Sequence, residues 1–313
     1  LQQFWRSGLG RAKTDRVGDA SGPASVNLIG YGRRGDADLD DLVTLARRID
    51  VEVVARIVTS FSIGEVRRAF GAAHNVVLFD ELTARAILTA RGLLAAPWHS
   101  LTGPFGVEGT RAWFLSLATL CGRREGAAGA WRSWHARYAE EIDALRARAA
   151  GHRIAMVMGV EQIPRVLNPY FNYGVPIIPL LEEMGFGLDV FVYDQITSRE
   201  PAAAHEPGDE LAGVERLAGY PYLDPPLKAD TGALNRVLRD PARHVVRTFS
   251  GYDGLLELLR ASSADLLYTE IYRDRRAICS GKVPFDLTVF GLGLSGAARL
   301  RTEAARDDEP WEE

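Results

Sequence analysis

The sequence predicts an α/β fold of two Rossmann-like, parallel-sheet domains joined by a helical connector. Two series of short apolar runs alternate with amphipathic helical patterns, and this alternation is typical of parallel sheets with right-handed crossovers. A stretch rich in Ala, Arg, Glu and Trp separates the two series. The length of 313 residues fits two domains of about 150 residues each.

The first series follows a polar, Gly-rich lead-in over residues 1–23, and we expect it to form a domain over 24–127. Its apolar runs predict strands at 25–30, 51–58 and 75–79. Apolar residues at helical spacing follow each strand, and Asp36 is the N-cap candidate of the first helix. A further helix is expected over 111–121.

Residues 128–150 are expected to form one connecting helix, and residues 151–313 the second domain. Its predicted strands lie at 153–159, 188–193, 244–249 and 265–269. Its predicted helices lie at 177–184, 232–238, 254–260 and 294–305. The Pro- and Gly-rich residues 199–226 predict a long excursion from the sheet.

Charge and composition exclude several classes of protein. The formal net charge is −4 and the sequence pI is about 6.0, so no electrostatic footprint for nucleic acid is present. A membrane span needs roughly 20 consecutive apolar residues, and the apolar runs end well before that. The first residues contain neither an initiator Met nor a signal-peptide core. We therefore expect a cytoplasmic protein and interpret the start as the cut end of a longer chain.

The cysteines and histidines predict no self-contained metal site. Cys121 and Cys279 are too far apart for a CxxC pair, and so few cysteines suit a reducing compartment. The six histidines show no HxH, HxxxH or HExxH spacing. Two thiolates are too few for an ordinary four-thiolate cluster, so we expect this segment alone to bind no iron–sulfur cluster.

The ends of the predicted strands select the candidate binding loops, because ligands of open parallel sheets bind outside the carboxyl ends of the strands. The loops that follow these ends are 31–36, 79–81, 159–165 and 269–280. We expect side chains of these loops, together with Gly159, to line one common cavity. They are Arg33, Arg34, Phe79, Asp80, Glu161, Gln162 and Arg165. The arginines favour an anionic group there. The alternatives are solvated charges at Arg33 and Arg34 and an ordinary strand-to-helix turn at 159–165.

A second candidate anion site lies in the Gly- and Pro-containing segment 103–110. Gly106 gives the loop conformational freedom, and Thr110 is expected to cap the helix that carries Trp113. The free N–H groups of a helix N-terminus favour an anionic ligand, such as a sulfide-rich cluster or a carboxylate. The alternative is a capped helix after a tight turn. The glycine run 291–296 has no preceding βαβ start and no downstream acidic partner, so it predicts no nucleotide site.

Five segments in a fixed order go beyond a generic α/β sequence. They are VNLIGYGRRGD at 26–36, AHNVV at 73–77, GPFGVEGT at 103–110, GHRIAM at 151–156, and VPF at 283–285 with GLGLSGA at 291–297. In this order and spacing, the chain resembles the nitrogenase component 1 superfamily over about residues 24–305. That superfamily includes the dinitrogenase subunits, their cofactor-assembly scaffold and nitrogenase-like reductases.

The resemblance implies a subunit of a nitrogenase-like two-component reductase. Such a subunit receives electrons from an ATP-dependent iron–sulfur reductase and pairs with a homologous component 1 subunit as a heterodimer or heterotetramer. An iron–sulfur or related metal cluster is expected in the full complex. The loop 159–165 is similar to the family loop, rich in glycine and carrying an arginine, that packs against the cofactor.

The departures from the family pattern argue against dinitrogen reduction. Phe79 stands where the cofactor-holding dinitrogenase subunit has a cysteine ligand, and 286–290 contains no histidine where that family has one. From the resemblance, we also expect this sequence to begin after the additional N-terminal domain of the family, whose cysteines bind the shared cluster. The alternative is therefore a non-catalytic scaffold or binding protein that holds a metal cluster or tetrapyrrole in the interdomain cleft. A glycosyltransferase is disfavoured, because no acidic nucleotide-sugar signature is present.

Two aromatic segments are candidate contacts for the homologous subunit. The first is 131–134, which contains Trp131 and Trp134, and the second is 170–173. Trp, Tyr and Arg are favoured anchor residues of protein interfaces. The alternative is that these aromatic side chains belong to the core of the domains.

Overall fold

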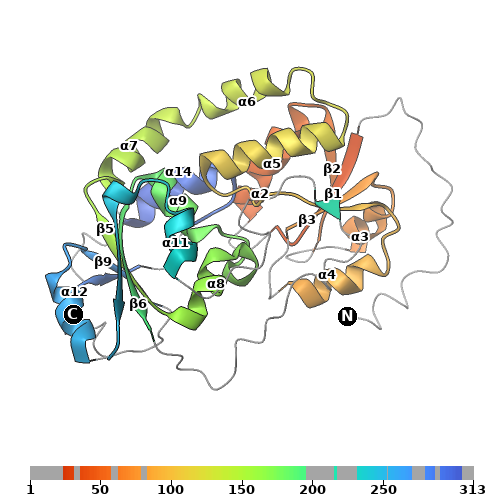
Figure 1. The fold of residues 1–313 in the computed structure, drawn as a ribbon. Coiled ribbons are helices and arrows are strands. Elements are labelled where there is room, and N and C mark those ends of the chain that lie inside the picture. Colours follow the sequence, from red (N-terminus) through yellow and green to blue (C-terminus); the bar gives the residue numbers. More distant parts are fainter. Residues whose placement is uncertain are drawn as a thin grey trace, which may run out of the picture.

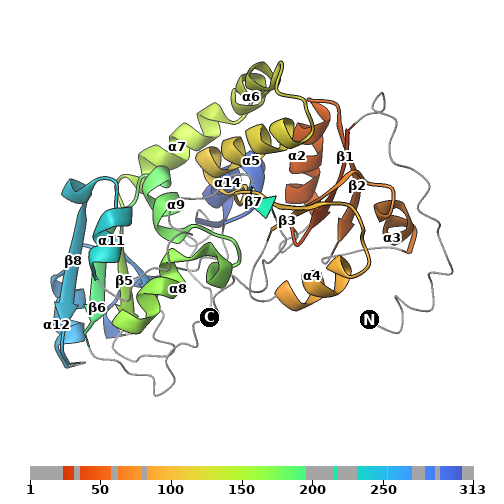
Figure 2. The same cartoon turned by 45° about the vertical axis from the view of Figure 1, so that its right-hand side comes forward.

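The structure is a computed structural model of the chain. It describes residues 24–31, 36–57, 63–78, 83–194, 215–216, 231–251, 253–269, 279–285 and 290–304. In these residues two five-stranded sheets lie side by side, each flanked by helices (Figures 1 and 2). All the strand pairs of both sheets are parallel. The predicted α/β fold with two parallel-sheet domains is confirmed.

Sheet A has the strand order β2-β1-β3-β4-β7. Its strands are β1 (Ala24–Ile29), β2 (Val51–Ile57), β3 (His74–Val77), β4 (Trp98–Ser100) and β7 (Glu215–Arg216). The helices around it are α2 (Asp36–Arg47), α3 (Ile63–Ala69), α4 (Ala84–Arg91) and α5 (Gly106–Leu120). Neither β4 nor β7 was among the predicted strands.

The residues of β1 alternate between two helical layers, because successive residues of a strand face opposite sides of the sheet. Val26 and Leu28 join the large core cluster that also contains side chains of α2 and α5. Ile29 joins a second cluster with side chains of α3 and α4. Asn27, on the same face as Ile29, is fully buried and donates through Nδ2 to the Ala69 carbonyl at 2.8 Å.

Sheet B has the strand order β10-β9-β5-β6-β8. Its strands are β5 (Arg153–Gly159), β6 (Gly187–Tyr193), β8 (His244–Phe249), β9 (Leu266–Thr269) and β10 (Val283–Pro284). The helices of this half are α8 (Ile163–Leu167), α9 (Ile177–Met184), α11 (Thr231–Val237), α12 (Asp253–Ala261) and α14 (Gly293–Ala304). Short 3-10 helices occur at η1 (Val160–Gln162), η2 (Pro169–Asn172) and η3 (Pro241–Arg243).

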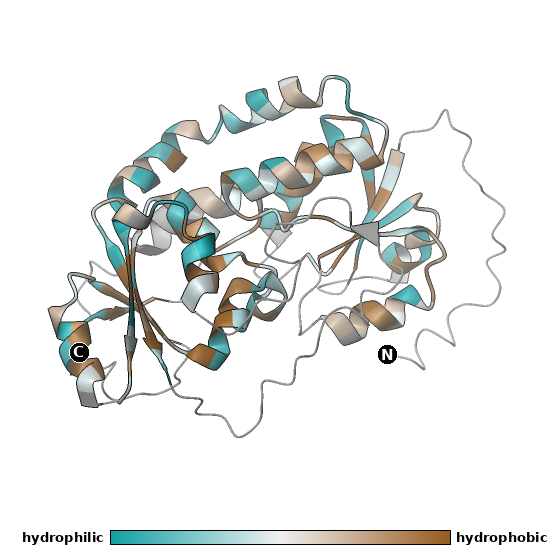
Figure 3. Cartoon of the chain, in the orientation of Figure 1, coloured by the Kyte–Doolittle hydropathy of each residue, from teal (hydrophilic) through white to brown (hydrophobic). Residues whose placement is uncertain are grey.

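The central strands β5 and β6 are buried along almost their whole length. Figure 3 shows them as mainly hydrophobic ribbons, whereas the outer helices mix hydrophobic and hydrophilic residues. This is why they appear in the sequence as continuous apolar runs. Among the described helices, none combines the length and the apolar character that crossing a membrane requires.

The connector is two helices rather than the single predicted helix over 128–150. They are α6 (Ala127–His135) and α7 (Ala139–Ala149), separated by a turn at 136–138. Trp131 is 7% exposed and Trp134 is 2% exposed, so the expectation that they form an exposed interface is wrong. Two guanidinium groups lie against the Trp134 ring, with Cζ of Arg48 at 4.7 Å and Cζ of Arg137 at 4.6 Å from its centre.

The C-terminal helix α14 returns to the first half of the chain and packs against α2, α5 and α7. The Leu292 N–H donates to Oδ2 of Asp38 on α2 at 3.2 Å, and both groups are buried. A Cβ on Gly296 would lie 2.3 Å from the Gly291 carbonyl carbon. Glycine is therefore needed at 291 and 296 because the backbone of these two residues comes into close contact.

Candidate functional site

The two halves of the molecule meet at the carboxyl ends of β3 and β4. A Cβ on Gly174, which follows η2, would lie 3.0 Å from a methyl group of Leu78, directly after β3. A Cβ on Gly103, which follows β4, would lie 2.8 Å from the Gly174 carbonyl oxygen. Tyr170 of η2 joins the core cluster that contains Ile29 of β1. Segment 169–175 is thus inserted onto the strand ends of sheet A, the edge at which open parallel sheets bind their ligands.

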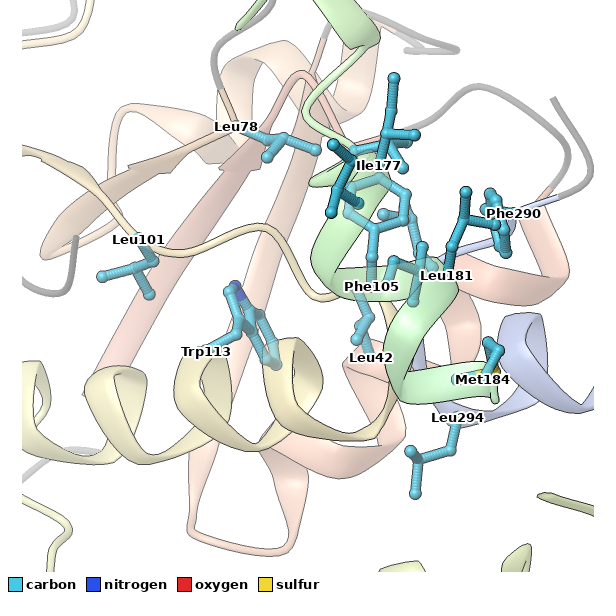
Figure 4. Packing of buried hydrophobic residues seen from close by; sticks show 14 of the residues in the cluster. Leu42, Leu78, Leu101, Phe105, Trp113, Ile177, Leu181, Met184, Phe290 and Leu294 are labelled. Carbon is cyan, nitrogen blue, oxygen red and sulfur yellow. The ribbon is translucent and has the colours of Figure 1, made fainter. Parts of the chain in front are cut away.

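A continuous apolar core crosses this junction. Figure 4 shows Ile177 and Leu181 of α9 beside Leu78 and Phe105 of the first half. All four belong to one cluster of buried residues that spans both sheets. The junction therefore holds the strand ends of the two halves at fixed positions.

Four predicted site residues lie outside the described residues, namely Arg33, Arg34, Phe79 and Asp80. Their convergence on one cavity stays a prediction. The residues at which their loops begin are fixed, because Tyr31 is 1% exposed and Leu78 is 6% exposed. The Tyr31 hydroxyl accepts a hydrogen bond from Nε1 of Trp113 at 3.0 Å. Burial raises the pKa of Tyr31, so this hydroxyl stays neutral.

Gly159, Glu161 and Gln162 are brought together in one tight turn after β5. The Gly159 N–H donates to Oε1 of Gln162 at 2.7 Å. A Cβ at Gly159 would lie 2.5 Å from Oε2 of Glu161, so a larger residue there would displace this carboxylate. The turn therefore places a carboxylate and an amide next to each other at the carboxyl end of sheet B.

Arg165 lies in the following helix, α8, and stacks on the segment that enters the junction. Its Cζ atom is 4.8 Å from the centre of the Phe171 ring. Its carbonyl oxygen accepts a hydrogen bond from Nδ2 of the buried Asn172 at 2.5 Å. The guanidinium of Arg165 is thus held beside segment 169–175 by a cation–π contact.

Thr110 does not cap α5, and this prediction is wrong. The helix begins four residues earlier, at Gly106, and the Thr110 hydroxyl donates to the Gly106 carbonyl at 2.5 Å. The N-cap residue is Phe105, whose side chain makes no capping bond. Gly106 itself has a positive φ of 66°, and a Cβ there would lie 2.7 Å from a methyl group of Leu180.

The free N–H groups of α5 do bind a carboxylate, but it belongs to the protein. Val107 N–H donates to Oε1 of Glu183 at 2.5 Å, and Glu108 N–H donates to Oε2 at 3.2 Å. Glu183 lies on α9, so this bond joins the two halves of the molecule. A second link is the ion pair of Glu108 Oε2 with Nη1 of Arg239, at 2.7 Å.

The environment of Glu183 is unusual for a carboxylate. Its side chain is 7% exposed, and Nη2 of Arg146 is 3.5 Å from its Oε1. Burial raises the pKa of Glu183, and the N–H groups of Val107 and Glu108 oppose only part of this effect. A carboxylate at a helix N-terminus satisfies two backbone donors, so this part of the predicted anion site is filled internally.

The described residues do not fit a metal cluster. No group of three or more His, Cys, Asp or Glu side chains in this part of the chain is arranged to hold a metal ion. Cys121 is the C-cap of α5, and burial raises the pKa of its thiol to about 11. Because a cluster requires thiolates, Cys121 is a poor ligand. Cys279 is exposed and is not disulfide-bonded.

Two polar arrangements were missed by sequence reasoning. One is the Glu183 carboxylate on α5, because Glu183 is 76 residues from Val107 in the chain. The other is a contact between His74 and His99, whose ring nitrogens are 3.2 Å apart. Recognising 98–100 as a strand beside 74–77 would have placed these histidines on neighbouring strands.

Comparison with known proteins gives one family. The model of the family described as "Nitrogenase component 1 type Oxidoreductase" matches residues 9–211. A solved structure titled "Nitrogenase Cp1 at pH 5" has 14% identity and a TM-score of 0.53, covering 96% of this chain and 61% of that chain. Another, titled "Nitrogenase Cp1 at pH 6.5", has 13% identity and a TM-score of 0.52, covering 96% of this chain and 63% of that one.

This likeness concerns the fold, since the identities are low. The chain spans about three fifths of the length of these nitrogenase chains. Among the curated proteins, none matches the chain.

Proposed function

Because the chain belongs to the nitrogenase component 1 type oxidoreductase family, we propose that it is a subunit of a nitrogenase-like two-component reductase. In this proposal it pairs with a homologous component 1 subunit in the cytoplasm. The complex accepts electrons from an ATP-dependent iron–sulfur reductase. Its substrate is not dinitrogen, since Phe79 and residues 286–290 supply neither of the expected ligands.

The observation that carries this proposal is the family match over residues 9–211. The junction at the carboxyl ends of β3 and β4 supports it, because Arg165, at the end of the turn 159–165, stacks on Phe171 of the segment inserted there. A ligand at this junction would meet the guanidinium of Arg165 and the carboxylate of Glu161. Their charges allow one ligand to be oriented at two points.

The described residues do not fit a cluster, so the proposal assigns the cluster ligands to other parts of the full complex. What this chain contributes is position and electrostatics, as proteins generally do around a redox cofactor. Arg165 is proposed to face an anionic group, with Gly159, Glu161 and Gln162 shaping the wall beside it. Arg33, Arg34, Phe79 and Asp80 are proposed to complete that wall.

The test uses the full-length protein co-expressed with its genomic neighbour and supplied with a reductase component and MgATP. ATP-dependent oxidation of the reduced reductase is measured, together with the iron content of the complex. The variant Arg165→Ala is expected to lower electron acceptance or iron retention. Its control, Arg148→Ala, removes the same charge from an exposed position in the last turn of α7 and is expected to leave both unchanged. Full activity and iron in Arg165→Ala would refute the proposed site.

A second candidate function is a scaffold that holds a metal cluster or tetrapyrrole without turning it over. The observation that favours it is the loss of both cofactor ligands of the family, at Phe79 and in residues 286–290. A complex that retains iron or a tetrapyrrole but never oxidises the reductase, with or without MgATP, would decide for the scaffold. Steady ATP-dependent oxidation of the reductase decides for the enzyme.

A further inference from the structure

His74 and His99 bring two imidazole nitrogens together on neighbouring strands. His74 begins β3, and His99 is the central residue of β4, where it pairs in register with Val76. Nδ1 of His74 is 3.2 Å from Nε2 of His99, and the ring centres are 5.1 Å apart. His99 is 4% exposed, while His74 is half-buried.

His74 lies away from the junction between the two halves, whereas His99 is the central residue of the three-residue strand β4. His74 is the first residue of its strand, whereas the junction is formed where β3 ends, next to Leu78. In parallel strands, residues two apart project from the same face, so His74 and Val76 share one face of sheet A. Register pairing then places His99 on that face too. The two rings therefore meet because of the sheet register, and the half-buried His74 leaves one side of the pair open to solvent.

We propose that His74 and His99 form a binding site for a divalent transition-metal ion such as Zn²⁺. Zinc–imidazole bonds of about 2.0–2.1 Å at a tetrahedral angle place the two nitrogens about 3.3 Å apart. The observed separation of 3.2 Å is close to this distance. Imidazole is also the ligand that zinc, copper and nickel share.

Without metal, the same distance is that of an N–H···N hydrogen bond, in which one of the two facing nitrogens carries a proton. Metal binding requires the donor ring to change tautomer: its facing nitrogen loses the proton and its other ring nitrogen takes one up. Both imidazoles then stay neutral, and both facing nitrogens coordinate the ion through their lone pairs. In the described part of the chain, no third His, Cys, Asp or Glu side chain completes the set. The two imidazoles supply two of the four positions that zinc usually takes.

This site differs in chemistry from the cluster of the proposed complex. It uses nitrogen ligands, lies at the opposite end of β3 from the junction, and needs neither a partner subunit nor a reductase. The Zn²⁺ test can therefore fail while the proposed function holds, and the proposed function can fail while Zn²⁺ binds.

The experiment uses the purified 313-residue protein without a histidine tag, freed of metal by chelation. Zn²⁺ is titrated calorimetrically, with Mg²⁺ as the negative control because it prefers oxygen ligands. One Zn²⁺ per chain is expected to bind, and excess Zn²⁺ is expected to raise the melting temperature, since it binds the folded chain. Mg²⁺ is expected to do neither.

Variants identify the ligands. His74→Gln, at a half-buried position, is expected to weaken Zn²⁺ binding by about tenfold or more and to abolish the rise in melting temperature. His99→Gln is expected to do the same, and circular dichroism checks that each variant is folded. The control is His135→Gln on α6, whose ring faces Trp131 at 5.9 Å and which is expected to bind Zn²⁺ as the wild type does. No saturable Zn²⁺ binding, or wild-type affinity in His74→Gln, would overturn the proposal.

Discussion

At the scale of single residues, Glu183 shows how one carboxylate fixes the position of two helices from different halves of the chain. Its two oxygens accept the N–H groups of Val107 and Glu108 at the start of α5. Its own carbonyl accepts a hydrogen bond from Nε of Arg146 at 3.1 Å, which adds α7 to the same contact. Removing this side chain leaves two helix donors without their acceptor.

The variant Glu183→Ala is therefore expected to lower the free energy of unfolding by about 1–3 kcal/mol, as loss of a helix cap and of buried hydrogen bonds does. Urea unfolding followed by circular dichroism measures this. Glu141→Ala, at an exposed position of α7, is the control and should change stability by no more than about 0.5 kcal/mol. Equal stability of the two variants would show that Glu183 does not support the junction.

The raised pKa of Glu183 gives a pH dependence with a defined sign. A carboxyl group whose pKa is higher in the folded chain binds more protons when folded, so stability falls as pH rises through the interval between its unfolded and folded pKa values. Glu183→Gln cannot titrate and is expected to remove this fall. Unfolding free energies of the variant and the wild type, compared from acidic to neutral pH, test the sign.

The neighbouring residue Glu182 is expected to behave in the opposite way. Burial acts to raise its pKa, but hydrogen bonds from His244 and from the Arg239 and Asp240 N–H groups outweigh it, so the pKa is lowered. Such a group stabilises the fold above its unfolded pKa, and this contribution is lost as pH falls. Glu182→Gln should therefore flatten the acid side of the stability curve. The same sign of change in both Gln variants would contradict this assignment.

Sequence reasoning at the residue scale succeeded where a residue's neighbours are local. Gly159, Glu161 and Gln162 were expected in the loop that follows the strand at 153–159, with an ordinary turn as the alternative, and the structure shows them in one turn. The N-terminal partner of α5 was not foreseeable, because Glu183 lies in a helix whose apolar pattern shows only that it packs. The tertiary structure decides which helix N-terminus the Glu183 carboxylate contacts.

At the scale of elements, long apolar runs were predicted and short or Gly-containing elements were not. β5 and β6 were recognised because both their faces are buried. β4 was missed since three residues, Trp98–Ser100, are too few to show alternation. The start of α5 was placed too late, because Gly106 and Gly109 lower helix propensity although they occupy its first turn.

The close approach of α14 to the segment that precedes it offers a test of element packing. Gly296→Ala is expected to destabilise the protein by about 1–3 kcal/mol, since its Cβ would lie 2.3 Å from the Gly291 carbonyl carbon. Gly129→Ala, inside α6 with no atom near the added Cβ, should instead stabilise by about 0.5–1 kcal/mol. Thermal melts of both variants decide this, and a stable Gly296→Ala protein would show that the contact is looser than described.

At the scale of the whole molecule, the chain crosses between its two halves more than once. After sheet B has begun, β7 (Glu215–Arg216) pairs with β4 in sheet A, and α14 returns to α2. A boundary read from the order of elements does not show such returns, because they depend on contacts far apart in the sequence. The proposed domain boundary at 128–150 therefore separates the two sheets only in their order along the chain.

The proposed partnership with a homologous subunit predicts a hetero-oligomer. The aromatic side chains expected to form its surface are mostly core, since Trp134 is 2% exposed and Tyr170 is 7% exposed. The prediction therefore rests on the family alone. Sedimentation of the full-length protein co-expressed with its genomic neighbour should show a complex of both chains, and a strict monomer would rule this out.

The central claim is that this component 1 type chain belongs to a cluster-containing complex without holding the cluster by itself. The most direct measurement is the iron and acid-labile sulfide content after anaerobic reconstitution, made on the isolated 313-residue chain and on the full-length complex with its partner. We predict iron and sulfide in the complex and less than stoichiometric amounts on the isolated chain. A stoichiometric iron–sulfur cluster retained by the isolated chain, or a reconstituted complex that contains neither iron nor sulfide, would contradict the claim.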